Sequence, residues 1–68
     1  MDKYKIASRL KELRSEKGVT TIEVAKACDI SPQAVTMYET GERIPRDEVK
    51  IRLAKYYKKS VTSIFYAE

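Results

Sequence analysis

The sequence contains no histidine and no tryptophan, and Cys28 is its single cysteine. These absences exclude an intramolecular disulfide, a zinc finger, a Ser/His/Asp triad and a Cys/His dyad. Carboxylate pairs such as Glu12 and Glu16 remain, but these two lie four residues apart among basic residues, which is typical of a solvated helix face. We therefore expect no enzyme, no catalytic residue, no metal site and no cofactor, and we expect Cys28 to be a small buried side chain.

Long apolar runs are also lacking, because no run of hydrophobic residues exceeds four. No segment could span a bilayer or serve as the apolar part of a signal peptide, so we expect a cytoplasmic protein without a membrane partner. The 68 residues predict one domain over residues 1–68. The net charge of +4 is compatible with binding to nucleic acid, but many basic domains bind none.

The hydrophobic pattern predicts an all-α protein with short helices. Ile6, Leu10 and Leu13 recur at the spacing that lines one face of a helix, which predicts a helix over residues 3–17 that Gly18 ends. Thr20 stands three residues before a glutamate, the signature of a capping box. A second helix is therefore expected from about residue 21 to residue 27 or 28.

Stronger start and stop signals follow. Ser31 is a good N-cap and Pro32 falls at the first helical position, where its missing amide hydrogen costs nothing. Gly41 then predicts the end of a helix over residues 32–40. A fourth helix is expected over roughly residues 46–58, followed by a last turn or two. The three residues that separate the second and third helices require a steep crossing about a tight turn, which is the helix-turn-helix pattern.

These segments resemble the Cro/repressor (XRE-type) helix-turn-helix family of bacterial and phage transcription regulators. The resemblance runs from RLKELRSEKGVT through EVAKACDISPQAVTMYETGERIP to LAKYYKKSVTSIF. It implies a compact, five-helix, lambda-repressor-like DNA-binding domain. In such a domain the third helix enters the major groove and the second lies across it against the DNA backbone.

Two residues depart from the family pattern. Asp29 occupies a turn position where the family usually has glycine, and aspartate tolerates a positive φ better than most residues. Thr21 stands where the family often has a glutamine that contacts phosphate and supports the reading helix. The shorter threonine side chain can reach a phosphate, but not both partners at once.

The helix expected over residues 32–40 carries one charged residue, Glu39. A helix in the major groove needs hydrogen-bonding and methyl-bearing side chains on its outer face. Gln33 can pair with adenine, Thr36 can offer its hydroxyl or methyl group, and Met37 can pack on a thymine methyl. We predict that these three residues read bases; the alternative is that Gln33 and Thr36 are ordinary surface residues and Met37 a packing residue.

Charge is expected at the margins of that helix. The resemblance implies backbone contacts from Thr40, Arg43 and Arg46, although the arginines could also be ordinary solvated charges. The N-terminal ends of the second and third helices, at Thr21 and at Pro32 or the residue after it, add positive dipole ends that suit phosphate. The resemblance further implies that Glu39 points inward and forms a structural salt bridge with Arg14.

The C-terminal end of the chain is more apolar than a domain of this size needs to cap its core. Because family members usually bind two half-sites as dimers, we predict a homodimer through the last helix. Its interface is expected to involve Ile64, Phe65 and Tyr66, with the first two at or behind the contact surface.

The predicted function is therefore a sequence-specific regulator, a repressor, that binds a double-stranded DNA operator as a homodimer. Since the sequence shows no sensor module, regulation would come from protein concentration, a regulatory protein partner or degradation. One alternative is a protein-binding module, such as an antitoxin or anti-regulator built on the same scaffold. The other, a small enzyme, lacks a plausible nucleophile and base.

Overall fold

The computed structural model describes residues 2–67, so Met1 and Glu68 of the predicted domain lie outside the described residues. Within that range the chain forms four α-helices and one π-helical turn and no strand. They are α1 (Lys3–Lys17), α2 (Thr21–Cys28), α3 (Pro32–Thr40), α4 (Asp47–Tyr57) and η1 (Thr62–Tyr66). The predicted all-α class is thus confirmed.

Local signals set the helix boundaries, with small differences from the predicted ranges. Asp2 caps α1 by accepting hydrogen bonds from the backbone amides of Tyr4 and Lys5. The predicted range of 46–58 for the fourth helix is one residue too long at each end, since Arg46 is its N-cap and Lys58 its left-handed C-cap. The C-terminal segment was expected to form a turn or two, and it forms the single π-helical turn η1.

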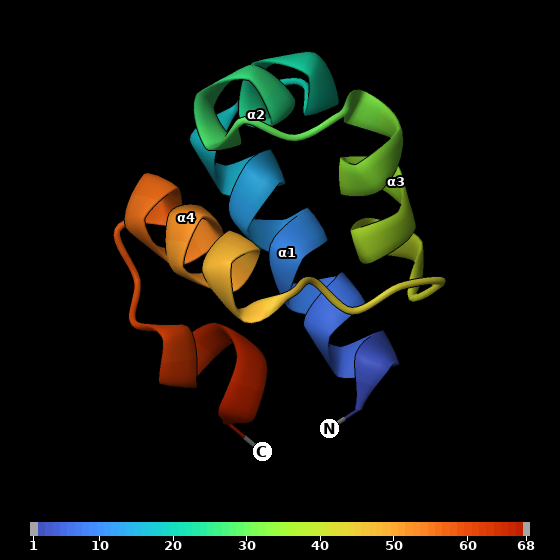
Figure 1. Ribbon diagram of the computed structural model, residues 1–68. Helices are drawn as coiled ribbons and strands as arrows, with labels where there is room; N and C mark the ends of the chain where they lie inside the picture. Colours follow the sequence, from blue (N-terminus) through green and yellow to red (C-terminus); the bar gives the residue numbers. More distant parts are fainter. Residues whose placement is uncertain (1, 68) are drawn as a thin grey trace.

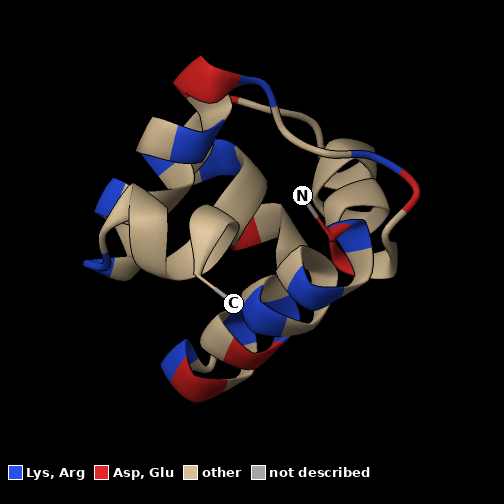
Figure 2. Cartoon of the chain, turned by 90° about the horizontal axis from the view of Figure 1, so that it is seen from below, with Lys and Arg blue, Asp and Glu red and all other residues tan. Residues whose placement is uncertain are grey.

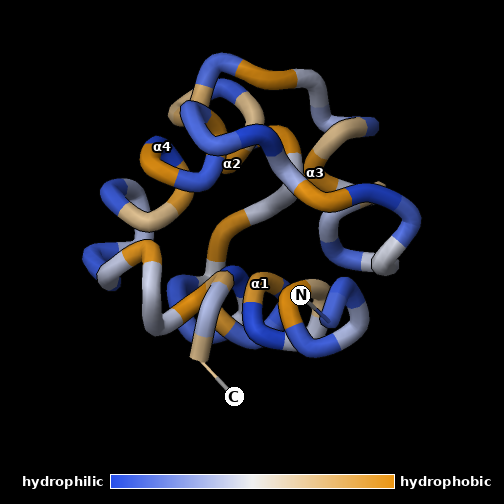
Figure 3. The backbone as a smooth tube through the Cα atoms, turned by 60° about the horizontal axis from the view of Figure 1, so that its bottom comes forward, coloured by the Kyte–Doolittle hydropathy of each residue, from blue (hydrophilic) through white to orange (hydrophobic). Residues whose placement is uncertain are grey.

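The helices pack around α1, which runs through the middle of the molecule (Figure 1). It contacts α3 on one side and α4 and η1 on the other, while α2 packs against both α3 and α4. The core between them is apolar, and its largest fully buried side chains are those of Ile6, Leu53, Ile64, Val24 and Cys28. Figure 3 shows that hydrophobic and hydrophilic residues alternate along the helices.

Candidate nucleic-acid interface

The turn between α2 and α3 is held by hydrogen bonds at both helix ends. Asp29 adopts the left-handed conformation, with φ 56° and ψ 49°, and its amide donates to the carbonyl of Ala25. Ser31 Oγ then accepts from the amide of Ala34 at 3.0 Å and so caps α3. Aspartate therefore fills the place of the expected glycine while keeping the positive φ. The turn is short and both helices are fixed in direction.

One face of α3 points inward and fixes how the helix lies on the domain. Val35, Tyr38 and Glu39 are buried. The opposite face carries Gln33, Thr36 and Thr40, which are exposed, with Met37 half-buried beside them. The buried and exposed sets follow the helical repeat, so α3 can present its outer face to another molecule without losing core contacts.

The hydrogen-bonding capacity of this outer face is uneven. Thr36 Oγ1 donates to the carbonyl of Pro32 at 3.2 Å, so its proton is engaged while its lone pairs and methyl group stay available. The side-chain amide of Gln33 has no hydrogen-bond partner among residues 2–67 and keeps both its donors and its acceptor. Gln33 is therefore the best-equipped residue of the face for a bidentate contact.

The predicted backbone-contacting residues lie around the ends of α2 and α3. Thr21 is half-buried at the first position of α2, while Arg43 and Arg46 are exposed after α3. Pro32 is exposed at the start of α3, but it has no amide hydrogen, so any backbone donor there comes from the next residue. Figure 2 shows that the backbone of α3 lacks basic residues and that charges lie in the loop that follows it.

Thr40 has a neighbour that the sequence interpretation missed. Its Oγ1 lies 3.2 Å from the carbonyl oxygen of Met37 and 3.3 Å from Oε1 of Glu42. A carboxylate at this place repels phosphate, so a backbone contact by Thr40 requires the Glu42 side chain to move. The sequence offered one signal for this, namely an acidic residue directly after Gly41.

An ion pair joins α3 to α1. Arg14 Nε lies 2.8 Å from Oε2 and 3.1 Å from Oε1 of Glu39. Arg14 Nη1 also donates to the carbonyl of Val19 at 3.1 Å, and so ties in the loop before α2. The hydrogen bond to Glu39 raises the pKa of Arg14 above its ordinary value. The expected pairing is present, and it holds α3 against α1.

The C-terminal prediction needs a correction. Ile64 and Phe65 are 1% and 2% exposed, so they belong to the core of the monomer and cannot be contact residues of a dimer interface. They can lie only behind such an interface, because η1 turns them against α1. Tyr66 remains 51% exposed.

Lys50 is a buried charge that the sequence interpretation did not single out. It is only 6% exposed, and its Nζ donates to the hydroxyl of Tyr66 at 3.0 Å. The same nitrogen lies 3.5 Å from Oδ1 of Asp47. The hydrogen bond to Tyr66 raises the pKa of Lys50. Lys50 therefore positions the exposed tyrosine of the C-terminal segment against α4.

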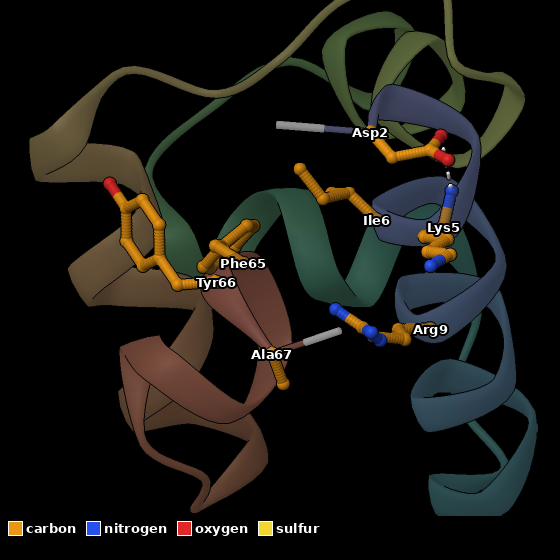
Figure 4. Close-up of a pocket in the computed structure, with 7 residues that line it drawn as sticks. All are labelled: Asp2, Lys5, Ile6, Arg9, Phe65, Tyr66 and Ala67. Atoms are coloured by element: carbon orange, nitrogen blue, oxygen red, sulfur yellow. Dashed lines mark hydrogen bonds between the residues drawn. The ribbon is translucent and has the colours of Figure 1, made fainter.

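A cavity of about 490 Å³ lies between the first turns of α1 and the C-terminal segment (Figure 4). Its lining residues are Asp2, Lys5, Ile6, Arg9, Phe65, Tyr66 and Ala67. None belongs to α2 or α3, so the cavity is separate from the outer face of α3. Among residues 2–67 there is no cluster of side chains that could hold a metal ion and no helix able to cross a membrane.

Comparison with known proteins agrees with this geometry. The model of a family described as helix-turn-helix matches residues 10–64. The chain belongs to the XRE-type helix-turn-helix family. Membership of this family supports DNA-binding regulation of transcription, and not catalysis, as the class of function.

One solved structure shows how far the likeness of the helix-turn-helix fold extends. The crystal structure of the clp gene regulator ClgR from C. glutamicum is similar over 94% of this chain and 83% of that chain. The TM-score is 0.83 and the sequence identity 25%. No curated protein matches the sequence. The match confirms the predicted fold over nearly the whole chain.

Proposed function

We propose that the protein is a sequence-specific double-stranded DNA-binding transcription regulator, a repressor that acts as a homodimer. Family membership and the likeness to a gene regulator support the regulator class. The observation that carries the sequence-specific part is the outer face of α3. It is polar, uncharged and exposed, while the opposite face is buried and fixed by the Arg14–Glu39 ion pair.

In this proposal α3 lies in the major groove. Gln33 pairs with the N6 and N7 edge of an adenine, Thr36 contacts a neighbouring base, and Met37 packs on a thymine methyl. No arginine or lysine stands on α3, and those are the side chains that most often read guanine. We therefore infer a half-site in which adenine and thymine dominate beneath α3.

Phosphate contacts fix the register of this complex without reading sequence. We assign them to Arg43 and Arg46 after α3 and to Thr21 with the N-terminal end of α2. Thr40 joins them only where Glu42 turns away. The arrangement places positive charge in the loop after α3 and uncharged groups on α3 itself. Different residues therefore bind phosphate and read bases.

Dimerisation would extend recognition to two half-sites about one helical turn apart. We assign Tyr66 to the contact surface, because it is exposed and is held against α4 by Lys50. Ile64 and Phe65 support it from behind. Sedimentation at micromolar concentration tests this assignment: a dimer is expected, and a monomer would refute it.

The experiment that tests the function is selection from random duplex DNA, followed by affinity measurements at several salt concentrations. We expect a two-fold symmetric site, rich in adenine and thymine under α3, that binds far more tightly than random duplex. A motif dominated by guanines under α3 would contradict the assigned contacts. Failure to enrich any sequence would favour a protein-binding module on the same scaffold.

Repression follows if the bound dimer occupies promoter DNA and excludes RNA polymerase. In vitro transcription from a promoter that carries the selected site should fall as protein is added. A template with a scrambled site is the control. An increase in transcript from the intact site would show an activator instead.

A further inference from the structure

The first turn of α1 packs against the C-terminal end of the reading helix. Gly41 ends α3 with φ 82°, and a β-carbon placed there would lie 2.8 Å from Cδ1 and 3.0 Å from Cε1 of Tyr4. The same β-carbon would lie 3.7 Å from the carbonyl oxygen of Lys3. Figure 1 shows the beginning of α1 beneath the loop that follows α3. The absence of a side chain at Gly41 therefore makes room for the Tyr4 ring.

Tyr4 contacts Gly41 and yet remains 66% exposed, the most exposed of the large hydrophobic side chains described. Its ring is not part of the core and lies at the surface beside the end of α3. The Nζ of Lys3 lies 5.4 Å from the centroid of this ring, within the range of a cation–π contact. The ring thus holds a lysine ammonium near the end of α3.

The charged side chains around Lys3 and Tyr4 differ in whether they have a partner. Lys3 is exposed, and no carboxylate among residues 2–67 forms a salt bridge with it. The nearby carboxylate of Asp2 accepts the backbone amides of Tyr4 at 2.9 Å and Lys5 at 3.2 Å. The hydrogen bonds from the amides of Lys5 and Tyr4 lower the pKa of Asp2, and the positive charge of Lys5 adds to this effect, so Asp2 stays ionised at neutral pH. The ammonium of Lys3 remains free to meet an external anion.

We propose that Lys3 and Tyr4 form a further DNA-backbone contact at the C-terminal end of the reading helix. In this arrangement the Lys3 ammonium and the Tyr4 hydroxyl donate to phosphate oxygens. Gly41 makes room for the ring that carries the hydroxyl and that lies beside the ammonium. The inference rests on the proposed function, because the anion is a phosphate of the DNA whose groove α3 enters. It extends the anchoring surface from the loop after α3 to α1.

Lys5 provides a matched control. It is an exposed lysine on the same turn of α1, but it lines the cavity beside the C-terminal segment and not the end of α3 (Figure 4). Lys3→Ala and Lys5→Ala change the net charge equally. Any difference between them in DNA binding therefore reports position and not total charge.

The test measures the dissociation constant of the intact chain between 50 and 200 mM salt, on the selected site and on random duplex. Lys3→Ala should lower the salt slope by about one unit, so that the wild-type protein loses roughly three- to fourfold more affinity than the variant over this range. Lys5→Ala should leave the slope nearly unchanged. Tyr4→Phe keeps the ring on Gly41 and should weaken binding to both DNAs alike, roughly two- to tenfold.

Equal slopes for Lys3→Ala and the wild-type protein, or for Lys3→Ala and Lys5→Ala, would overturn the Lys3 contact. Unchanged affinity of Tyr4→Phe would overturn the tyrosine contact. Thermal unfolding of each variant is the control: a melting temperature equal to that of the wild-type protein shows that a loss of affinity does not come from a loss of folding. If the wild-type protein selects no sequence but Lys3→Ala still lowers the slope on random duplex, the proposed function fails while this contact stands. If a site is selected but Lys3→Ala has the salt slope of the wild-type protein, the proposed function stands and this contact fails.

Discussion

The ion pair between α1 and α3 gives the sharpest stability prediction, because its two partners differ in burial. The side chain of Glu39 is 6% exposed and that of Arg14 is 25% exposed. Removing one partner of a fully buried pair costs about 3–5 kcal/mol, since the other charge is left without compensation. The cost here should therefore depend on which partner is removed.

Glu39→Gln leaves a guanidinium that water can reach and that keeps its hydrogen bond to the Val19 carbonyl. We expect a loss of about 1–2 kcal/mol in the free energy of unfolding, below the fully buried range. Arg14→Met keeps the apolar stem but strands a buried carboxylate, and should cost about 3 kcal/mol. In a domain of this size these losses correspond to melting temperatures lower by about 4–8 °C per kcal/mol.

The assay is urea and thermal unfolding at pH 7, followed by circular dichroism, for both single variants and the double variant. Because the residues contact each other, the double variant should be less destabilised than the sum of the singles by about 1–3 kcal/mol. The reasoning is refuted if Arg14→Met costs no more than Glu39→Gln, or if the two losses simply add. Either result would mean that the pair is solvated and does not fix α3.

Three further predictions concern base reading, alkaline stability and thiol reactivity. Gln33→Ala should lower the free energy of DNA binding by about 1–3 kcal/mol at one base position of the selected site. Arg43→Ala should weaken binding to all sequences alike and lower the salt slope by about one unit. Equal effects of the two variants would contradict the division between base reading and phosphate contact. Burial raises the pKa of Tyr57 above its ordinary 10.0. The contribution of the protonated tyrosine to the free energy of unfolding is therefore complete below pH 10 and is lost as the pH rises toward the folded pKa. Melting temperatures between pH 7 and 11 should therefore fall less steeply for Tyr57→Phe, and parallel curves would count against this. Burial also raises the pKa of the Cys28 thiol, and the residue is 1% exposed, so alkylation by iodoacetamide should be slow until urea unfolds the protein. Rapid labelling of the native state would show that the α2–α3 joint opens.

The boundaries of α3 could be predicted because they depend on neighbours in the sequence. Ser31 caps α3 through the amide three residues on, and Gly41 ends it in the left-handed conformation. Both effects need only a few adjacent residues. The same holds for Asp29, whose tolerance of positive φ is a property of its own side chain.

Parts of the candidate site could not be predicted in this way. The competition of Glu42 for the hydroxyl of Thr40 depends on side-chain directions after α3 has ended. The contact of Tyr4 with Gly41 joins residues far apart in the sequence, and the period of α1 alone does not indicate it. The base and phosphate contacts stay predictions, because they depend on a partner molecule.

The sequence by itself determined the all-α class and the order and approximate limits of the helices, since capping, periodicity and turn chemistry act over a few residues. Only the tertiary structure decided which apolar residues remain available at the surface. Ile64 and Phe65 are buried against α1 and leave Tyr66 outside, while Lys50 is buried although it is charged. The physical reason is that burial depends on which elements the chain brings together, and the hydrophobicity of a segment does not specify the surface that covers it.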